Sequence, residues 1–169
     1  MKYYIKDLVY GANDGIVTTF AIVTGVVGGG LSTRAVLIIG LASLFADGFS
    51  MAASNYLGSR SEAAVLADDS DPDGPDGIPT VPWLSAVLTF AAFVLVGAVP
   101  LVPYVLLSGR RTTLWCAVGS TLAVLFAVGA ARTVVTKRKP WSAGLEMVLI
   151  GGAAAGMAYS VGRLVSTAA

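Results

Sequence analysis

The sequence predicts an all-α, polytopic membrane protein: one transmembrane domain built as a bundle of five spanning helices over residues 1–169. Two observations support this fold class. Apolar residues make up 56% of the 169 residues and charged residues only 12%, about half the charged fraction of a typical soluble domain. The chain also contains five mostly apolar stretches of about 20 residues, the length that a helix needs to cross a bilayer. A surface so poor in charge suits lipid better than water.

Breaks between the apolar stretches define the expected helices. A glycine-rich turn follows the first stretch, and a short acidic loop at 63–80, rich in Asp, Pro and Gly, follows the second. Pro100 and Pro103 are expected to kink the end of the third helix or to begin its loop. Basic turns separate the last helices. The expected helices cover residues 7–29, 35–62, 83–107, 113–132 and 143–165.

The distribution of basic residues predicts the orientation. Cytoplasmic loops of membrane proteins carry the larger share of Lys and Arg. The side that holds the N-terminus has seven of them and the opposite side four, which places the N-terminus and the 63–80 loop in the cytoplasm and the C-terminus outside. We expect no secretory leader, because Asn13 and Asp14 interrupt the first apolar run. A prokaryotic plasma membrane is the expected location. The seven residues are Lys2, Lys6, Arg60, Arg132, Lys137, Arg138 and Lys139; the four are Arg34, Arg110, Arg111 and Arg163.

The composition excludes several functions. The chain has no histidine, which rules out Ser-His-Asp and Cys-His catalysis and every His-ligated metal site. The net charge of +1 gives no electrostatic reason to bind nucleic acid. Cys116 is the only cysteine and lies in an apolar stretch, where we expect it to be inert. We therefore expect no enzyme, no cofactor and no nucleic-acid partner.

Ionisable residues inside expected spans are candidates for function, because burying them in a bilayer is costly. Asp14 in the first helix and Asp47 in the second lie deepest. Asp7 precedes Asp14 by seven residues, two turns along the same helix face. Glu62 is expected near the cytoplasmic face of the bilayer. These residues mark the first two helices as the place for a cation path.

On the second helix, Asp47, Met51 and Asn55 recur every four residues and form one stripe. Carboxylate and amide oxygens suit hard or borderline divalent ions, and a thioether is softer. Because Mg²⁺ and Ca²⁺ take oxygen ligands, the methionine favours Fe²⁺ or Mn²⁺. Simpler interpretations stay open: a methionine that fills space, an asparagine that hydrogen-bonds between helices, or an aspartate that pairs with Arg132 or caps the turn at residues 13–15.

Glycine spacings indicate close helix packing. Small residues four apart let two helices approach closely, and the chain has such pairs at 11 and 15, 25 and 29, and 152 and 156. In a sequence with 20 glycines such pairs arise readily by chance. We therefore interpret them as a sign of tight packing and only weakly of dimerisation.

Two motifs carry a family resemblance. The stretch DLVYGANDGIVTTF at 7–20 resembles the first-helix signature of the vacuolar iron transporter family. The stretch ADGFSMAASNY at 46–56, followed by SRSE at 59–62, resembles its second-helix signature. The resemblance implies a dimeric, five-helix, proton-coupled exporter of Fe²⁺, and often Mn²⁺, from the cytosol. It also implies that Asp14 and Met51 line the path, with Asp7 nearer the cytoplasmic mouth.

The sequence departs from the better-known members of that family in two ways. Those members carry Gly-Glu-Tyr or Gly-Glu-Phe where this chain has Ser54-Asn55-Tyr56. A carboxylate is present instead one turn before the methionine, at Asp47, which conserves charge and changes its position. Those members also have a long, Glu-rich helical metal-binding domain after the second helix. Only the residues 63–80 occupy that place here.

We therefore expect a two-fold symmetric homodimer whose first two helices face the symmetry axis. Asp14, Asp47, Met51 and Asn55 form a membrane-level metal site, and Asp7 and Glu62 feed it from the cytoplasm. Low dielectric favours protonated carboxyl groups, and a bound metal ion displaces those protons, so that metal is exchanged for protons. The alternatives are a membrane scaffold or metal sensor that does not transport, and a passive cation conductor.

Overall fold

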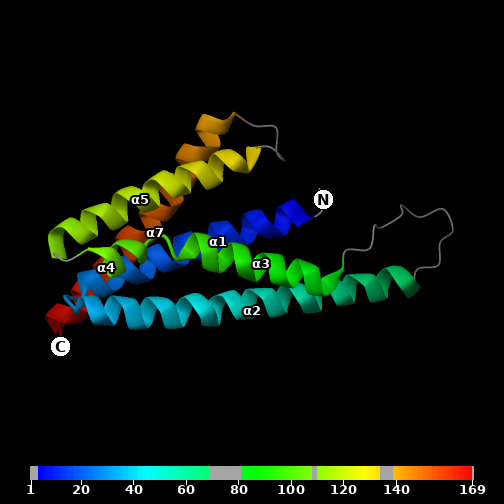
Figure 1. Cartoon of the computed structure of the whole chain (residues 1–169), viewed down its shortest axis with the longest axis horizontal. Helices are drawn as coiled ribbons and strands as arrows, with labels where there is room; N and C mark the ends of the chain where they lie inside the picture. The colour runs from blue at the N-terminus through cyan, green and yellow to red at the C-terminus, as the bar shows by residue number, and fades with distance from the viewer. Residues whose placement is uncertain (1–3, 69–80, 108–109, 134–138, 169) are drawn as a thin grey trace.

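The computed structural model describes residues 4–68, 81–107, 110–133 and 139–168, and the regular structure within these ranges is helical throughout. Successive long helices run in opposite directions along one long bundle (Figure 1). They are α1 (Tyr4–Gly28), α2 (Thr33–Asp68), α3 (Pro82–Gly97), α4 (Val102–Leu106), α5 (Arg110–Ala131) and α7 (Pro140–Ala168).

The expected third helix, 83–107, is not continuous: α3 ends at Gly97 and α4 begins at Val102. Pro100 causes the break, because proline has no N–H to donate and its ring clashes with the carbonyl of the preceding turn. The chain turns instead, and the N–H of Leu101 donates to the carbonyl of Ala98 at 2.9 Å. The prediction of one helix across this stretch was therefore wrong, although a kink at the prolines was expected.

The second helix is longer than expected. It begins at Thr33 and ends at Asp68, so residues 63–68 of the expected acidic loop are helical. Alanine and leucine, which favour helix, dominate the added turns and explain the extension. The rest of that loop, residues 69–80, lies outside the described residues.

Three of the described helices are long and apolar enough to cross a membrane: Thr33–Val65, Thr112–Ala131 and Pro140–Ala168. Large apolar side chains on their outer faces, such as Phe49 on α2 and Leu149 on α7, are exposed. Helices of this kind identify an integral membrane protein. The helix α1 is not among the three, and the polar residues Asn13 and Asp14 lie in its middle. The expected count of five spans is thus not reproduced within the described ranges.

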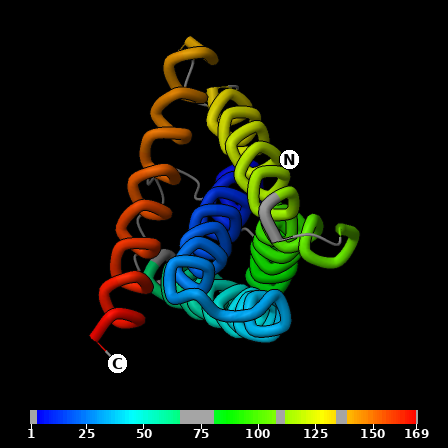
Figure 2. Tube along the Cα trace, turned by 90° about the vertical axis from the view of Figure 1, so that its left-hand side faces the viewer, coloured from blue at the N-terminus to red at the C-terminus, as the bar shows by residue number. Residues whose placement is uncertain are grey.

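The first helix occupies the centre of the bundle (Figure 2). It packs mainly against α3 and α7 and more lightly against α2 and α5. The long helix α2 lies along α3, and α5 lies along α7. The contact between α1 and α2 brings Asp14 of α1 near Asp47 of α2.

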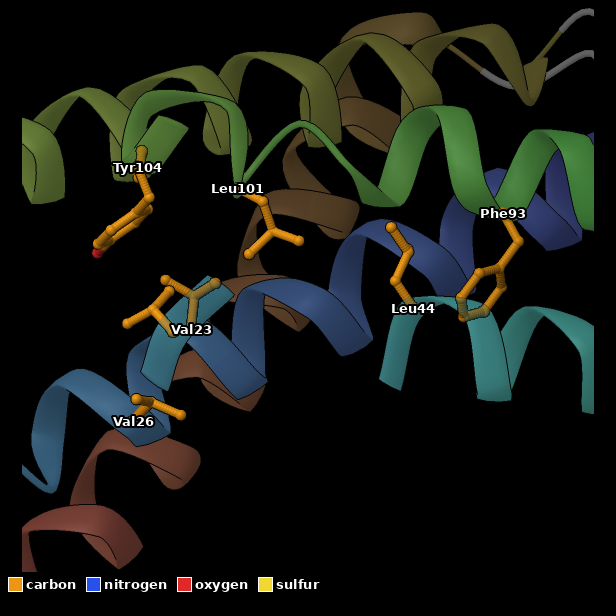
Figure 3. Packing of buried hydrophobic residues seen from close by; sticks show 8 residues of the cluster. Val23, Val26, Leu44, Phe93, Leu101 and Tyr104 are labelled. Carbon is orange, nitrogen blue, oxygen red and sulfur yellow. The ribbon is translucent and has the colours of Figure 1, made fainter. Parts of the chain in front are cut away.

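Two groups of buried side chains hold this arrangement together. One joins α1 to α2, α3 and α4 through Val23, Leu44, Phe93 and Tyr104 (Figure 3). The other joins α1 to α5 and α7, and its members are Ile16, Phe20, Leu125, Met147 and Ala155. Between helices in a membrane, van der Waals packing of such side chains replaces the hydrophobic effect as the main source of cohesion.

Glycines at 11 and 15 bring α1 and α3 into backbone contact. A Cβ atom added to Gly11 would lie 2.5 Å from the carbonyl oxygen of Thr89, and one added to Gly15 would overlap the carbonyl oxygen of Phe93. No larger residue fits at either position without moving α3. This contact sets the position of α3 along the axis of α1, and therefore the position of the polar residues of both helices.

Candidate metal site

The candidate residues form a strip along the facing sides of α1 and α2. Because α1 and α2 are antiparallel, residues early in α1 lie opposite residues late in the facing part of α2. Asp14 faces the region of Asp47, and further along the pair a single pocket is lined by α1 residues at 7 and 10 and α2 residues at 51 and 55. We call the residues Asp7, Tyr10, Asp14, Asp47, Met51 and Asn55 the polar strip. At 1.5 Å per residue the strip is about 10 Å long.

Asp14 and Asp47 form one end of the polar strip. The two carboxylates lie near enough to repel each other. Both side chains are exposed, and neither has a hydrogen bond or an ion pair to any described residue. The pair is therefore a concentration of negative charge that the described part of the protomer does not neutralise.

The packing of two glycines explains why these carboxylates point away from α3. Gly15, the residue after Asp14, contacts the backbone of Phe93, and a Cβ on Gly48, the residue after Asp47, would lie 3.1 Å from the Phe93 ring. Neighbouring residues of a helix are about 100° apart around its axis. When the two glycines face α3, the preceding aspartates are turned towards the open side.

A pocket of about 290 Å³ forms the other end of the polar strip. The groups in this pocket that could bind a metal ion are the half-buried carboxylate of Asp7, the thioether of Met51 and the side-chain amide oxygen of Asn55. The ammonium group of Lys6 lies 5.7 Å from the centre of the Tyr10 ring, a cation–π distance. The pocket lining consists of Lys6, Asp7, Tyr10, Met51, Ser54, Asn55 and Thr89.

Hydrogen bonds to α3 orient the amide of Asn55. Its Nδ2 atom donates to Oγ1 of Thr89 at 2.7 Å and to the carbonyl oxygen of Ser85 at 3.4 Å. The carbonyl oxygen of the Asn55 side chain has no hydrogen bond to a described residue. The interpretation of Asn55 as a hydrogen bond between helices is thus right for its nitrogen and leaves its oxygen available.

The structure separates the predicted site residues into groups. Asp7, Met51 and Asn55 share the pocket, and Asp14 and Asp47 lie further along the strip, outside its lining. Glu62 is exposed two turns beyond Asn55 and does not line the pocket. In the described ranges no three His, Cys, Asp or Glu side chains come together as a metal site.

Four pocket residues were not predicted from the sequence, namely Lys6, Tyr10, Ser54 and Thr89, and Thr89 is the one that comes from a third helix. It is 1% exposed and lies on α3, a helix to which no site residue was assigned. A signal was present, because Ser85 and Thr89 are the two hydroxyl residues of α3 and lie one turn apart. Arg132 donates to Glu146 at 2.9 Å, and neither Asp14 nor Asp47 pairs with Arg132 in the described ranges.

Comparisons with known proteins find relatives that share one name. Vacuolar iron transporter 1 of Oryza sativa subsp. japonica is 24% identical over 216 aligned residues, which cover 96% of this chain and 86% of the rice protein. Vacuolar iron transporter 1 of Eucalyptus grandis is 26% identical over the same length, covering 96% and 87%. The vacuolar iron transporter of Toxoplasma gondii is 49% identical over 59 residues, 35% of this chain and 20% of that protein.

The alignments to the two plant proteins are longer than the 169 residues of this chain, so those relatives contain inserted residues. The VIT family model matches in two parts, residues 5–73 and 64–163, which meet at the end of α2. This is the place where the sequence analysis expected a domain to be missing. Because the two matches together include most of the chain, this protein belongs to the vacuolar iron transporter (VIT) family.

Proposed function

We propose that the protein transports Fe²⁺, Mn²⁺ or both out of the cytosol in exchange for protons. The observation that carries this proposal is the polar strip: three carboxylates without a hydrogen bond or ion pair in the described structure, next to a thioether and an available amide oxygen. The names of the relatives, vacuolar iron transporter, support a metal ion as the substrate.

The metal ion enters at the pocket and passes along the strip. Asp7, with Glu62 further out on α2, attracts cations at the cytoplasmic end. Met51 and the Asn55 oxygen are the neutral ligands, and the Asp14 and Asp47 carboxylates supply the charge at the far end. A thioether ligand disfavours Mg²⁺ and Ca²⁺, which prefer oxygen. Met51 therefore selects for the transition metals.

A homodimer completes the site. Asp14 and Asp47 are exposed at mid-helix on the open side of α1 and α2, and turning two carboxylates towards lipid is costly. A second copy of the chain related by a two-fold axis covers this face and doubles the ligand set. No three carboxylates come together in the described part of one protomer, and the second copy would supply further ligands.

Protons are the coupling ion. In a low-dielectric site the neutral form of a carboxyl group is favoured, so the aspartates bind protons when no metal is present. Metal binding needs the ionised carboxylates and releases those protons. Alternate exposure of the site to the two sides then exchanges metal for protons without ATP.

The start of α1 and the end of α2 lie at one end of the bundle, and the C-terminus lies at the other (Figure 1). With the N-terminus in the cytoplasm, the pocket opens towards the cytoplasm and the C-terminus is outside. The plasma membrane of a prokaryote is the proposed location.

The first prediction tests the role of Met51 in proteoliposomes with an acidic interior. The wild-type protein should accumulate Fe²⁺ and Mn²⁺ and exclude Mg²⁺. Met51→Ala should lower Fe²⁺ and Mn²⁺ uptake by about tenfold, a typical cost of disturbing a metal site. It should also reduce the ratio of Fe²⁺ or Mn²⁺ uptake to Mg²⁺ uptake. Metal-sensitive dyes inside the vesicles measure each ion.

Met157→Ala is the matched control, because Met157 is 66% exposed on the outer face of α7 and should transport as the wild type does. Equal uptake by Met51→Ala and the wild type would overturn the site. Wild-type flux that ignores the pH gradient would identify a passive conductor. No flux at all would favour the scaffold or sensor.

A further inference from the structure

A hydrogen-bond chain links the third helix to the pocket. The hydroxyl group of Thr89 donates to the carbonyl oxygen of Ser85 at 2.8 Å, one turn earlier in α3. The same Thr89 oxygen lies 2.7 Å from Nδ2 of Asn55 on α2. Thr89 is 1% exposed, and its hydroxyl group has no other partner among the described residues.

The direction of this chain determines which end of the Asn55 amide faces α3. A hydroxyl group has a single proton, and Thr89 uses it on Ser85. Its oxygen then offers only lone pairs to Asn55, and the second partner, the Ser85 carbonyl, also only accepts. The NH₂ group must therefore point at α3, and the side-chain oxygen is left for the pocket.

The backbone around Thr89 is held in place as well. The carbonyl oxygen of Thr89 lies against Gly11 of α1, where an added Cβ would come within 2.5 Å. Three helices thus meet at this level: α1 presses on the Thr89 backbone, and the Thr89 side chain holds α2 through Asn55. An orientation set by such a contact does not need a metal ion to form it.

We propose that Thr89 is a positioning residue that keeps the Asn55 side-chain oxygen directed at the metal in the pocket. This inference rests on the proposed function, because it assigns a task to a residue outside the α1–α2 strip. A reversed amide would direct two N–H groups at a cation that Asp7 and Met51 are placed to bind, which is repulsive. Thr89 therefore sets the affinity for the metal and does not contact it.

The test uses Mn²⁺ binding to the purified protein, followed by electron paramagnetic resonance of free Mn²⁺, together with initial rates of Mn²⁺ uptake in proteoliposomes. Thr89→Val keeps the shape of the side chain and removes the hydroxyl group. It should weaken Mn²⁺ binding and raise KM by about tenfold, as loss of a group that orients a ligand does, with little change in maximal rate. Thr89→Ser should restore both.

Thr121→Val is the matched control. Thr121 is fully buried on α5, and its hydroxyl group donates only within its own helix, to the carbonyl oxygen of Ala117 at 2.6 Å. It measures the effect of losing a buried threonine hydroxyl away from the pocket. It should bind Mn²⁺ as the wild type does.

A second variant shows whether Thr89 acts through Asn55. In the Asn55→Ala background, Thr89→Val should cause no further loss of binding. If Thr89→Val and Asn55→Ala each weaken Mn²⁺ binding and the double variant loses the product of the two factors, the positioning role is overturned. It is also overturned if Thr89→Val and Thr121→Val weaken Mn²⁺ binding equally. If Met51→Ala weakens binding and Thr89→Val does not, this inference fails and the proposed function stands. A wild-type protein that neither binds nor moves Mn²⁺ or Fe²⁺ overturns both.

Discussion

The two sides of the bundle differ in whether their carboxylates have a partner in the described structure. On the side of α5 and α7, Glu146 is paired with Arg132 at 2.9 Å. On the side of α1 and α2, the carboxylates of Asp7, Asp14 and Asp47 have no hydrogen bond or ion pair to a described residue. A buried or membrane-level charge without a partner is costly. The paired acid therefore contributes to the structure of the bundle, and the unpaired acids are the ones to which the proposed function assigns a metal ion.

Glycine spacing shows the same contrast. Gly11 and Gly15 of α1 lie against the backbone of α3 and admit no side chain. Gly152 and Gly156 of α7 have the same spacing, yet a Cβ atom added to either would meet nothing within 4 Å. One sequence pattern thus has two uses: the first pair brings helices together beside the polar strip, and the second lies on an open face of the protomer.

The largest expected difference is between the unpaired and the paired acid. Asp14→Asn removes charge from the metal path and should lower Fe²⁺ and Mn²⁺ transport by at least about 10–100-fold. Glu146→Gln keeps the shape of its side chain, is distant from the polar strip and should transport within about twofold of the wild type. Initial rates of uptake into proteoliposomes, normalised to the amount of folded protein, measure both variants. Equal losses would show that pairing does not separate structural from functional acids.

The next difference concerns packing. In Gly15→Ala the new methyl group overlaps the Phe93 carbonyl oxygen, and because backbone cannot move aside easily, we expect a loss of about 1–3 kcal/mol in stability. Gly152→Ala adds a methyl group in open space within a helix, which is neutral or stabilising by about 0.5–1 kcal/mol. Thermal unfolding in detergent compares the two.

Gly15→Ala also moves the neighbouring Asp14, so its transport should fall further than the amount of folded protein does. A Gly15→Ala variant as stable as Gly152→Ala would mean that the contact between α1 and α3 is looser than the structure has it.

The sequence predicted the helical class and the faces of α1 and α2, because helical periodicity is a local property. The spacing of Met51 and Asn55 places them on one side of α2, and both do line the pocket. The place of Thr89 in the pocket was not predictable in this way. It depends on the height at which α3 packs against α1, and that height is set by a contact between Gly11 and the Thr89 carbonyl.

The break between α3 and α4 was predicted only in part, as a kink or the start of a loop at Pro100 and Pro103, for a related reason. Hydropathy continues without a gap across 97–102, so the apolar stretch looks like one span. Backbone hydrogen bonding decides otherwise, because Pro100 cannot donate to the preceding turn. Local chemistry at one residue outweighs the average character of the 25 residues around it.

The smallest expected effect lies in the ion pair itself. Arg132 and Glu146 are 28% and 46% exposed, and a pair this open to its surroundings stabilises a protein by about 1 kcal/mol or less. A double-mutant cycle with Arg132→Gln and Glu146→Gln, measured by unfolding in detergent, should give a coupling energy in that range, decreasing with salt. The double variant should still transport Mn²⁺. A coupling energy of several kcal/mol, or a transport defect in the double variant that exceeds its loss of folded protein, would place this pair in the transport cycle and remove the distinction between the two sides of the bundle.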